Sequence, residues 1–324
     1  MQLSKKNIIS SVVFLLGLVA LLVLVSMFFR PKKNTEYYGM EEPRANGILS
    51  EPKETLDVFF VGDSISYTSI IPLQIWRDYG ITSYLCGSAM QELFYTKEFV
   101  NKMFETQSPE IVFLGTATIF NDFTEKEKIW NSLEQIIPIF RYHDRWKTFN
   151  KWPEWKSGFE MDYTHQEPGK GYYYSLGAEG IDATGYAFET TAVEWVPDIN
   201  KETLLEIKEI CDVHGAQLIL LSEPNVAGSW GPHRHNAAAI LAEEMGVEYI
   251  DMNYMQEAVP IDWMTDTFDG GDHLNYYGAQ KVSAYLGKYL AETGLFEDKR
   301  ENPEYDFWKE AQAQFYEGKP EQNP

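Results

Sequence analysis

The chain opens with a long apolar run that is unlike anything after it. Uncharged residues extend without a break from Ile8 to Phe29, and basic residues stand on both sides. A helix needs about 20 apolar residues to cross the hydrocarbon core of a bilayer. The run is longer than the apolar part of a usual signal peptide, and no small-x-small cleavage pattern follows it. Residues 1–33 are therefore predicted to form an uncleaved signal-anchor helix, with a cleaved signal peptide as the alternative.

After residue 54, short apolar runs alternate with longer amphipathic stretches. Five of the short runs predict buried strands: 57–61, 83–86, 110–114, 217–221 and 247–250. Residues 236–245 predict a helix that ends at Gly246, and a second helix is expected from about 277 to 290. Strands that alternate with helices are typical of a mostly parallel sheet covered by helices. We therefore predict an α/β fold with three layers, α/β/α, around a five-stranded sheet.

Three segments interrupt this alternation. Residues 34–54 are polar and contain Pro and Gly, which predicts a linker, and residues 301–324 predict a polar tail. The main domain is thus expected over 55–300. Within it, residues 141–200 lack a clear period, are rich in Trp and Tyr, and predict an insertion at the mouth of the sheet. Most of its aromatic rings are expected to pack in the core, and one or two to stack on sugar: Trp146, Trp152, Trp155, Tyr172, Tyr173, Tyr174 and Trp195.

Charge and cysteine content narrow the function classes. The formal net charge is −22, and the first 33 residues carry five basic and no acidic residues, which leaves −27 on residues 34–324. Such a domain is repelled by nucleic acid and by anionic lipid, so neither is an expected partner of it. Cys86 and Cys211 fall on a strand and on a helical pattern, and are expected to be small core residues. No metal or other cofactor is predicted.

The first candidate for chemistry directly follows the first predicted strand. In open α/β sheets, ligands bind beyond the carboxyl ends of the strands. Gly62-Asp63-Ser64 stands there, where a glycine allows a sharp turn and the next helix offers free amide groups to an oxyanion. By itself the triplet also fits an ordinary serine at a helix start.

The second candidate lies near the end of the domain, in the run from Thr267 to Ala279. His273 follows a loop with two acids, Asp269 and Asp272, and precedes a helix. A serine hydroxyl becomes a good nucleophile when an imidazole accepts its proton and a carboxylate fixes the imidazole's tautomer. A solvated histidine in an acidic loop is the alternative.

Taken together, the two blocks resemble the SGNH/GDSL hydrolases over residues 56–292. The Gly-Asp-Ser block after the first strand and the Asp-x-x-x-His-Leu-Asn-x-x-Gly-Ala block before the last helix carry the likeness. The resemblance is nearest to the membrane-tethered envelope branch, which includes proteins of teichoic-acid D-alanylation and exopolysaccharide O-acetylation. Residues 221–225, Trp230, 235–236 and 141–146 also fit that branch. The fold that this resemblance implies is flavodoxin-like.

The family pattern assigns roles position by position. Ser64 matches the nucleophile, and its amide is expected to join that of Gly87 in the oxyanion hole; His273 matches the general base. The family's acid usually stands three residues before the histidine, where this chain has Gly270. Asp269 and Asp272 remain the candidates, and Asp269 is preferred because adjacent side chains such as those of Asp272 and His273 tend to diverge.

The third family block departs from the pattern. The family supplies an asparagine to the oxyanion hole after the third strand, but this chain continues Gly115-Thr116-Ala117-Thr118. Losing one donor costs about 2.7–4 kcal/mol of transition-state stabilisation. Either Thr116 or Thr118 substitutes, Asn121 reaches back, or the enzyme is slow.

Several polar residues are expected near the substrate. Asn225, Arg234 and Arg141 are candidate binding residues, with a structural ion-pair cluster as the alternative for Arg141. His233 and His235 have a spacing that suits a metal, but no third ligand is evident.

The resemblance implies a serine esterase or O-acyltransferase that acts on acyl esters, preferably acetyl, of a cell-envelope glycan. The domain is expected outside the cytoplasm and tethered to the membrane by residues 1–33. A non-catalytic glycan-binding or assembly protein of the same fold is the alternative. The sequence predicts no oligomeric state.

Overall fold

A computed structural model describes residues 4–151 and 160–319 of the 324-residue chain, without the side chains of residues 148–151. The chain divides into two compact units. We call residues 1–43 with 124–165 the N-terminal unit, and residues 44–123 with 166–324 the sheet unit. The boundaries cross the predicted insertion 141–200, so its two halves belong to different units.

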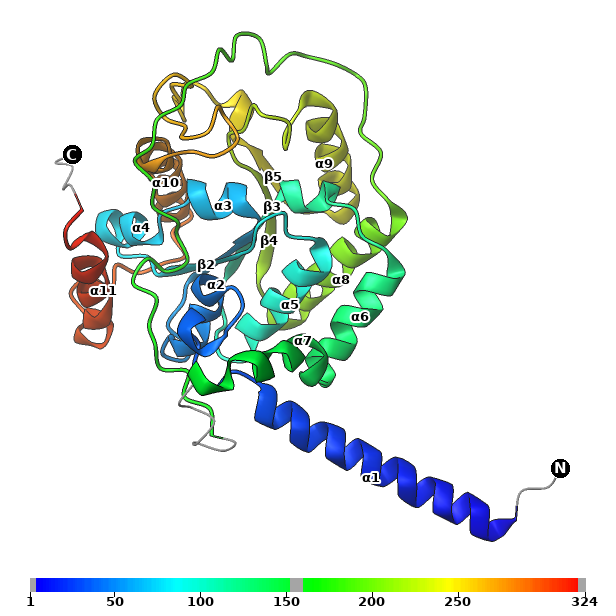
Figure 1. Ribbon diagram of the computed structural model, residues 1–324. Helices are drawn as coiled ribbons and strands as arrows, with labels where there is room; N and C mark the ends of the chain where they lie inside the picture. The colour runs from blue at the N-terminus through cyan, green and yellow to red at the C-terminus, as the bar shows by residue number, and fades with distance from the viewer. Residues whose placement is uncertain (1–3, 152–159, 320–324) are drawn as a thin grey trace. The chain divides into compact units, whose positions relative to one another are not determined.

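The sheet unit is built on five parallel strands, as the sequence predicts (Figure 1). Their order is β2-β1-β3-β4-β5, which is the flavodoxin-like order. The chain leaves the neighbouring strands β1 and β3 in opposite directions, so a crevice is expected at their carboxyl ends. The strand bounds are β1 Val58–Gly62, β2 Ser83–Gly87, β3 Ile111–Gly115, β4 Gln217–Ser222 and β5 Glu248–Asp251.

Both faces of the sheet are covered by helices. Alternate strand residues such as Phe59 and Phe60 enter two separate apolar clusters, because successive side chains point to opposite faces. Figure 1 shows α3, α4 and α10 on one side and α5, α8 and α9 on the other. The bounds are α3 Ser64–Ser69, α4 Pro72–Tyr79, α5 Leu93–Phe104, α8 Asp198–His214, α9 Pro232–Met245 and α10 Tyr276–Glu292. Cys86 and Cys211 are buried core residues, as expected.

The N-terminal unit contains the apolar helix α1, Lys5–Phe29. Among the described residues, α1 is the one helix long and apolar enough to cross a membrane. The same unit holds α6 (Glu125–Ile136), α7 (Ile139–Tyr142) and the 3₁₀ segments η1 (Glu36–Tyr38) and η4 (His143–Lys151). A capping box at Thr124 starts α6, where the Thr124 and Glu127 side chains each bond the other's backbone N–H.

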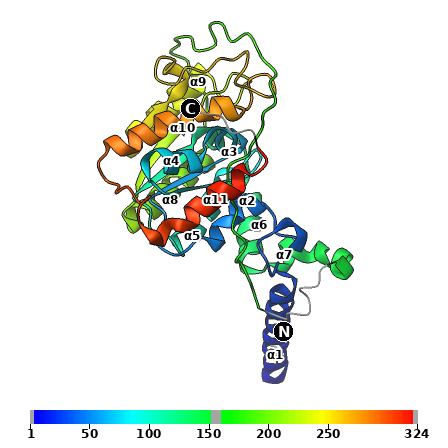
Figure 2. The ribbon, with the colours of Figure 1, turned by 90° about the vertical axis from the view of Figure 1, so that its left-hand side faces the viewer.

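Two segments are more ordered than their composition predicts. Part of the expected linker 34–54 folds into α2 (Pro43–Asn46) and η2 (Gly47–Ser50), with Ala45 and Ile48 buried. Glu51 forms a fully buried ion pair with Lys170, Nζ to Oε1 2.7 Å. The expected tail contains α11, Asp306–Tyr316, which lies over α4 (Figure 2). Trp308 of α11 is fully buried beside Trp76, so one side of α11 is part of the core.

The aromatic residues of 141–200 have mixed environments. Tyr172 is buried and Tyr174 packs against the core, whereas Trp146, Tyr173 and Trp195 are exposed. Trp152 and Trp155 lie outside the described residues. The core interpretation therefore holds for only part of the set.

Candidate active site

The turn after β1 places Ser64 at the carboxyl edge of the sheet. Asp63 caps α3 by accepting a hydrogen bond from the Ile65 amide, 3.0 Å, and Ser64 is the first helical residue. Gly62 has no space for a side chain, because a Cβ there would lie 2.0 Å from Ser66 Oγ. The sharp turn thus depends on glycine at position 62, and it leaves the Ser64 hydroxyl partly exposed.

Ser64, His273 and Asp269 form a continuous hydrogen-bonded chain. His273 Nε2 lies 2.8 Å from Ser64 Oγ, and His273 Nδ1 lies 2.6 Å from Asp269 Oδ2. Because a carboxylate only accepts, Nδ1 carries the proton and Nε2 offers its lone pair to the serine hydroxyl. The ring of Phe268 stacks on the imidazole at 5.6 Å and holds its plane.

The loop that carries the acid and the base is closed by its own hydrogen bonds. Thr267 Oγ1 donates to the His273 carbonyl, 2.8 Å, and accepts from the Gly271 amide, 2.8 Å. Gly270 and Gly271 have φ of +75° and +94°, which non-glycine residues rarely adopt. The family's usual acid position therefore holds Gly270 because the loop requires a positive φ there. Asp269, one residue earlier, accepts a hydrogen bond from the His273 amide as well as contacting its ring.

Asp272 is less favourably placed. Its Oδ2 lies 3.6 Å from His273 Nδ1, and its Oδ1 and carbonyl both accept from the Asn225 side chain, at 3.1 and 2.8 Å. Asn225 is fully buried, so its side chain fixes the loop from the interior of the sheet unit. This position disagrees with the expected role of Asn225 in substrate binding.

Gly87 lies next to the serine turn. It pairs in register with Gly62, and a Cβ on Gly87 would lie 3.3 Å from the Asp63 carbonyl oxygen and 2.9 Å from that of Gly62. Only glycine lets the backbones approach so closely, which brings the end of β2 against the Ser64 turn.

The Thr116 hydroxyl is used elsewhere. Thr116 Oγ1 lies 2.5 Å from Ser222 Oγ, Ser222 Oγ lies 2.9 Å from the Tyr249 hydroxyl, and Tyr249 donates to Asp251 Oδ2, 2.9 Å. The Tyr249 hydroxyl has one hydrogen, and it donates this hydrogen to Asp251. Ser222 must therefore donate to Tyr249, and Thr116 must donate to Ser222. The Thr116 hydroxyl hydrogen thus points into this chain and is not available to an oxyanion, contrary to expectation.

The other two candidates for a third oxyanion donor are also engaged. The Thr118 hydroxyl donates to the Gly115 carbonyl, 2.8 Å, and the Asn121 amide donates to the Gln91 carbonyl, 2.9 Å. The Asn121 side chain also stabilises the charged form of Asp63, so it lies beside the serine turn.

Two buried carboxyls lie beneath the site. Burial raises the pKa of Asp63 to about 6, although the Ile65 amide and His273 both favour its charged form. Burial raises the pKa of Glu223 to about 8, against a 2.5 Å hydrogen bond from Ser66 Oγ. The negative charges of Asp63 and Asp251 act in the same direction as burial in raising this pKa.

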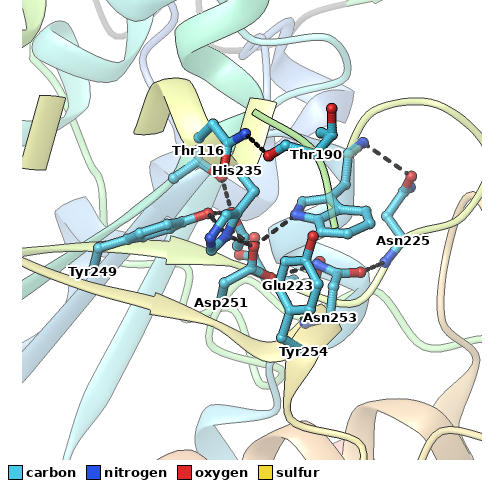
Figure 3. A network of polar contacts seen from close by, with 12 residues as sticks. Thr116, Thr190, Glu223, Asn225, His235, Tyr249, Asp251, Asn253 and Tyr254 are labelled. Carbon is cyan, nitrogen blue, oxygen red and sulfur yellow. Dashed lines mark hydrogen bonds and ion pairs between the residues drawn. The ribbon is translucent and has the colours of Figure 1, made fainter. Parts of the chain in front are cut away.

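A second imidazole–carboxylate pair lies beyond β5 (Figure 3). His235 Nδ1 is 2.6 Å from Asp251 Oδ2, which also accepts from Trp230 Nε1, 2.8 Å, and from Tyr249. Asp251 Oδ1 accepts from the Asn253 amide and side chain. His235 is thus a component of a dense polar network, rather than half of a metal pair with His233.

The two predicted arginines have partners other than a substrate-binding role requires. Arg234 donates to the Ser229 carbonyl, 2.9 Å, and its guanidinium lies 4.9 Å from the centre of the Phe120 ring. Arg141 belongs to the N-terminal unit, where it donates to Asn131, 2.6 Å, and pairs with Glu134, 3.4 Å. For Arg141 this favours the structural ion-pair interpretation.

Sequence reasoning missed Arg44, which it placed in the linker. The Arg44 guanidinium lies 4.5 Å from the centre of the Tyr67 ring and 5.0 Å from that of Tyr173. Tyr67 follows Ser64 on α3 and touches Gly87. A lone arginine in a polar stretch carries no sequence signal for such a position.

A pocket of about 470 Å³ adjoins the loop of the acid and base. It is lined by Tyr186, Trp263, Asp182, Asp262 and Ile181, among others. The side chain of Ile181 also faces Gly271, at 2.9 Å from where a Cβ would stand. Aromatic rings with acidic side chains are suited to polyhydroxylated ligands, whose rings have apolar faces.

One group of potential metal ligands exists among the described residues. Asp269, Asp272 and His273 offer ligand atoms within 4.8 Å of one another. The Nδ1 proton of His273 is directed at Asp269 and Nε2 at Ser64, so a metal would have to displace one of these bonds.

Comparisons with known proteins find matches among solved structures alone. No protein-family model matches the sequence, and no curated protein matches it. Solved structures that it resembles include the lipase/acylhydrolase from Enterococcus faecalis, at 12% identity over 74% of this chain and 97% of that one, TM-score 0.38. Others are a GDSL-like lipase from Bacteroides thetaiotaomicron (11%, 73% and 88%, 0.36) and a psychrotrophic esterase from Pseudoalteromonas (7%, 73% and 98%, 0.39).

Proposed function

We propose that this chain is a serine esterase or O-acyltransferase of the SGNH/GDSL type. The observation that carries the proposal is the unbroken chain Ser64 Oγ–His273–Asp269, with links of 2.8 and 2.6 Å. It combines a nucleophile, a base and an orienting acid at the carboxyl edge of an α/β sheet. Asp269 rather than Asp272 is the acid, because it has the shorter bond to Nδ1.

The proposed reaction proceeds through an acyl-enzyme. Ser64 Oγ attacks the ester carbonyl while His273 Nε2 takes its proton, and the C–O bond of the ester breaks as His273 returns that proton to the leaving alcohol. Water or a sugar hydroxyl then attacks the acyl-enzyme by the same proton transfers in reverse order. The amides of Ser64 and Gly87 donate to the oxyanion.

We propose that the substrate is an acyl ester, with acetyl preferred, of a cell-envelope glycan. The pocket lined by Tyr186 and Trp263 beside the catalytic loop supports a sugar ligand. The length and apolarity of α1 support a single membrane span, with the sheet unit outside the cytoplasm as in the resembling branch.

A fluorophosphonate probe and a small acetyl ester test this function. We expect the full chain to be labelled and to hydrolyse the ester, and Ser64→Ala to do neither. Thr116→Ser, which keeps the donated hydroxyl, is the matched control and should label like the wild type. Absence of labelling in the wild type would contradict the proposed enzymatic function.

The rival is a non-catalytic glycan-binding or assembly protein, which the commitment of the Thr116 hydroxyl to Ser222 favours. Glycan binding without probe labelling or ester turnover would support it. Analysis of products with a glycan acceptor present separates hydrolysis from transfer, because only transfer moves the acyl group to the acceptor.

A further inference from the structure

Helix α6 has its apolar side turned outward. Ile129, Trp130, Leu133 and Ile136 are 58%, 49%, 36% and 75% exposed. Residues spaced by three, four and seven lie on one helix face, so these side chains form a continuous stripe. The opposite side holds Asn131, which is buried and bonded to Arg141. A surface helix of a soluble domain normally has the reverse arrangement.

The segment after α6 is bonded to the end of α1. The Ile139 amide at the start of α7 donates to Ser26 Oγ, 3.2 Å, in the last turn of α1. The buried Arg145 guanidinium donates to the Phe29 carbonyl, and the Tyr163 hydroxyl to that of Pro31, 2.9 Å. These contacts fix α7 and η4 at the point where α1 would leave a bilayer.

Aromatic and basic side chains accompany the stripe. Trp130 stacks on Phe140 of α7, with ring centres 5.3 Å apart, and Trp146, next to Arg145, is 60% exposed. Lys126 and Lys128 lie on α6 itself. Trp is enriched at the boundary between lipid and water, and the stems of Lys side chains lie along apolar surface while the amines stay in water.

Charge also separates the two units. Lys5 and Lys6 begin α1 and would lie across the bilayer; without them the N-terminal unit has 10 Lys and Arg against 10 Asp and Glu, net zero, whereas the sheet unit has 15 against 39, −24. An anionic lipid surface repels the strongly acidic sheet unit, whereas it does not repel the N-terminal unit.

We propose that the outward stripe of α6 forms a membrane-contact surface, seated in the headgroup region of the bilayer that α1 crosses. This inference rests on the proposed insertion of α1. An amphipathic helix with Trp and aliphatic residues on one face binds such an interface by burying that face. Helix α7 contacts both the end of α1, through Ile139 and Ser26, and the stripe, through Phe140 and Trp130, which is why we choose lipid over a protein partner. The chain is then held at the membrane by two elements.

The test measures probe depth on the full-length chain in phosphatidylcholine–phosphatidylglycerol vesicles. A nitroxide is attached to one new cysteine at a time, and collision with oxygen, which favours lipid, is compared with collision with a water-soluble nickel chelate. Native Cys86 and Cys211 are fully buried and do not compete for the label. Ile136→Cys probes the stripe, and its neighbour Gln135→Cys, one residue around the helix, is the matched control. Leu18→Cys probes α1.

We expect the oxygen-to-nickel ratio at Ile136→Cys to be shifted toward that of Leu18→Cys, and the ratio at Gln135→Cys to match that of a probe in water. Equal, water-like ratios at 135 and 136 with a lipid-like ratio at Leu18→Cys would overturn the surface and leave the anchor intact. A water-like ratio at Leu18→Cys would reject the anchor itself. Spin–spin broadening at Ile136→Cys would mean that a second copy, not lipid, covers the stripe, and would also overturn the proposal.

Discussion

The sheet unit contains two imidazole–carboxylate pairs with the same bond. In each, Nδ1 of a histidine lies 2.6 Å from an aspartate oxygen, at His273–Asp269 and at His235–Asp251. They differ in surroundings. His273 Nε2 meets the Ser64 hydroxyl, whereas His235 belongs to a network in which Asp251 also accepts from Trp230, Tyr249 and Asn253. Asp269 is partly exposed in a loop, and Asp251 is buried at the end of β5.

Position along the sheet edge explains the difference. Ser64 follows β1, and β5 is three strands away, which is roughly 14 Å at 4.8 Å per strand. His235 is therefore out of reach of the Ser64 hydroxyl. An oriented histidine becomes a general base only where the fold delivers a nucleophile to its second nitrogen. The pair at β5 instead ties α9 to the sheet.

The largest expected difference in kcat is between His273→Ala and His235→Ala. In serine enzymes, loss of the base lowers kcat on the order of a million-fold. We expect such a loss for His273→Ala and, since His235 touches no reacting atom, a kcat for His235→Ala close to that of the wild type. Steady-state hydrolysis of an acetyl ester, with thermal denaturation to confirm folding, decides it. If both variants lose turnover alike while remaining folded, the two pairs have not been distinguished correctly.

Asp269→Asn and Asp272→Asn separate the two acids of the loop. Asparagine at the orienting position favours the wrong imidazole tautomer and costs about 10⁴ in kcat. We expect that loss for Asp269→Asn and less than about tenfold for Asp272→Asn, whose main contact is with Asn225. The same kinetic assay applies, and the reverse ranking would assign the acid to Asp272.

The sequence was informative where a local rule acts. The five strands, the residues Ser64 and His273, and the preference for Asp269 follow from apolar runs, a Gly-Asp-Ser turn and the geometry of adjacent side chains. The polar composition of 34–54 and 301–324 hid the burial of Ile48 and Trp308, because each stands in a short apolar pair, Ile48-Leu49 or Phe307-Trp308, whose packing partners are distant in sequence. Asp251 and the direction of the Thr116 hydrogen bond depend on three strands at once, which no local pattern encodes.

Glu223 lies between the two pairs, and its burial predicts a pH effect on stability. Its pKa is raised from 4.5 to about 8, so between these values the folded state keeps a proton that the unfolded state has lost. This contribution to stability is complete below pH 4.5 and is lost as pH rises to about 8, with a slope of up to roughly 1.4 kcal/mol per pH unit. Glu223→Gln should flatten the profile. Chemical denaturation at pH 5, 6.5 and 8 measures it; parallel profiles for the two proteins would contradict the burial argument.

The smallest expected effect on kcat is that of Thr116→Val. This variant tests whether the hydrogen-bond network at β5 contributes to catalysis. Removing an oxyanion donor lowers kcat by about 10²–10³. Because the Thr116 hydroxyl donates to Ser222, we expect Thr116→Val to keep kcat within about threefold, far from that loss. It should instead cost on the order of 1 kcal/mol in the free energy of unfolding, since a buried acceptor loses its donor. Thr116→Ser restores the donor and should recover the stability. A hundred-fold fall in kcat for Thr116→Val, rescued by Thr116→Ser, would place the hydroxyl at the oxyanion and join the two regions into one site.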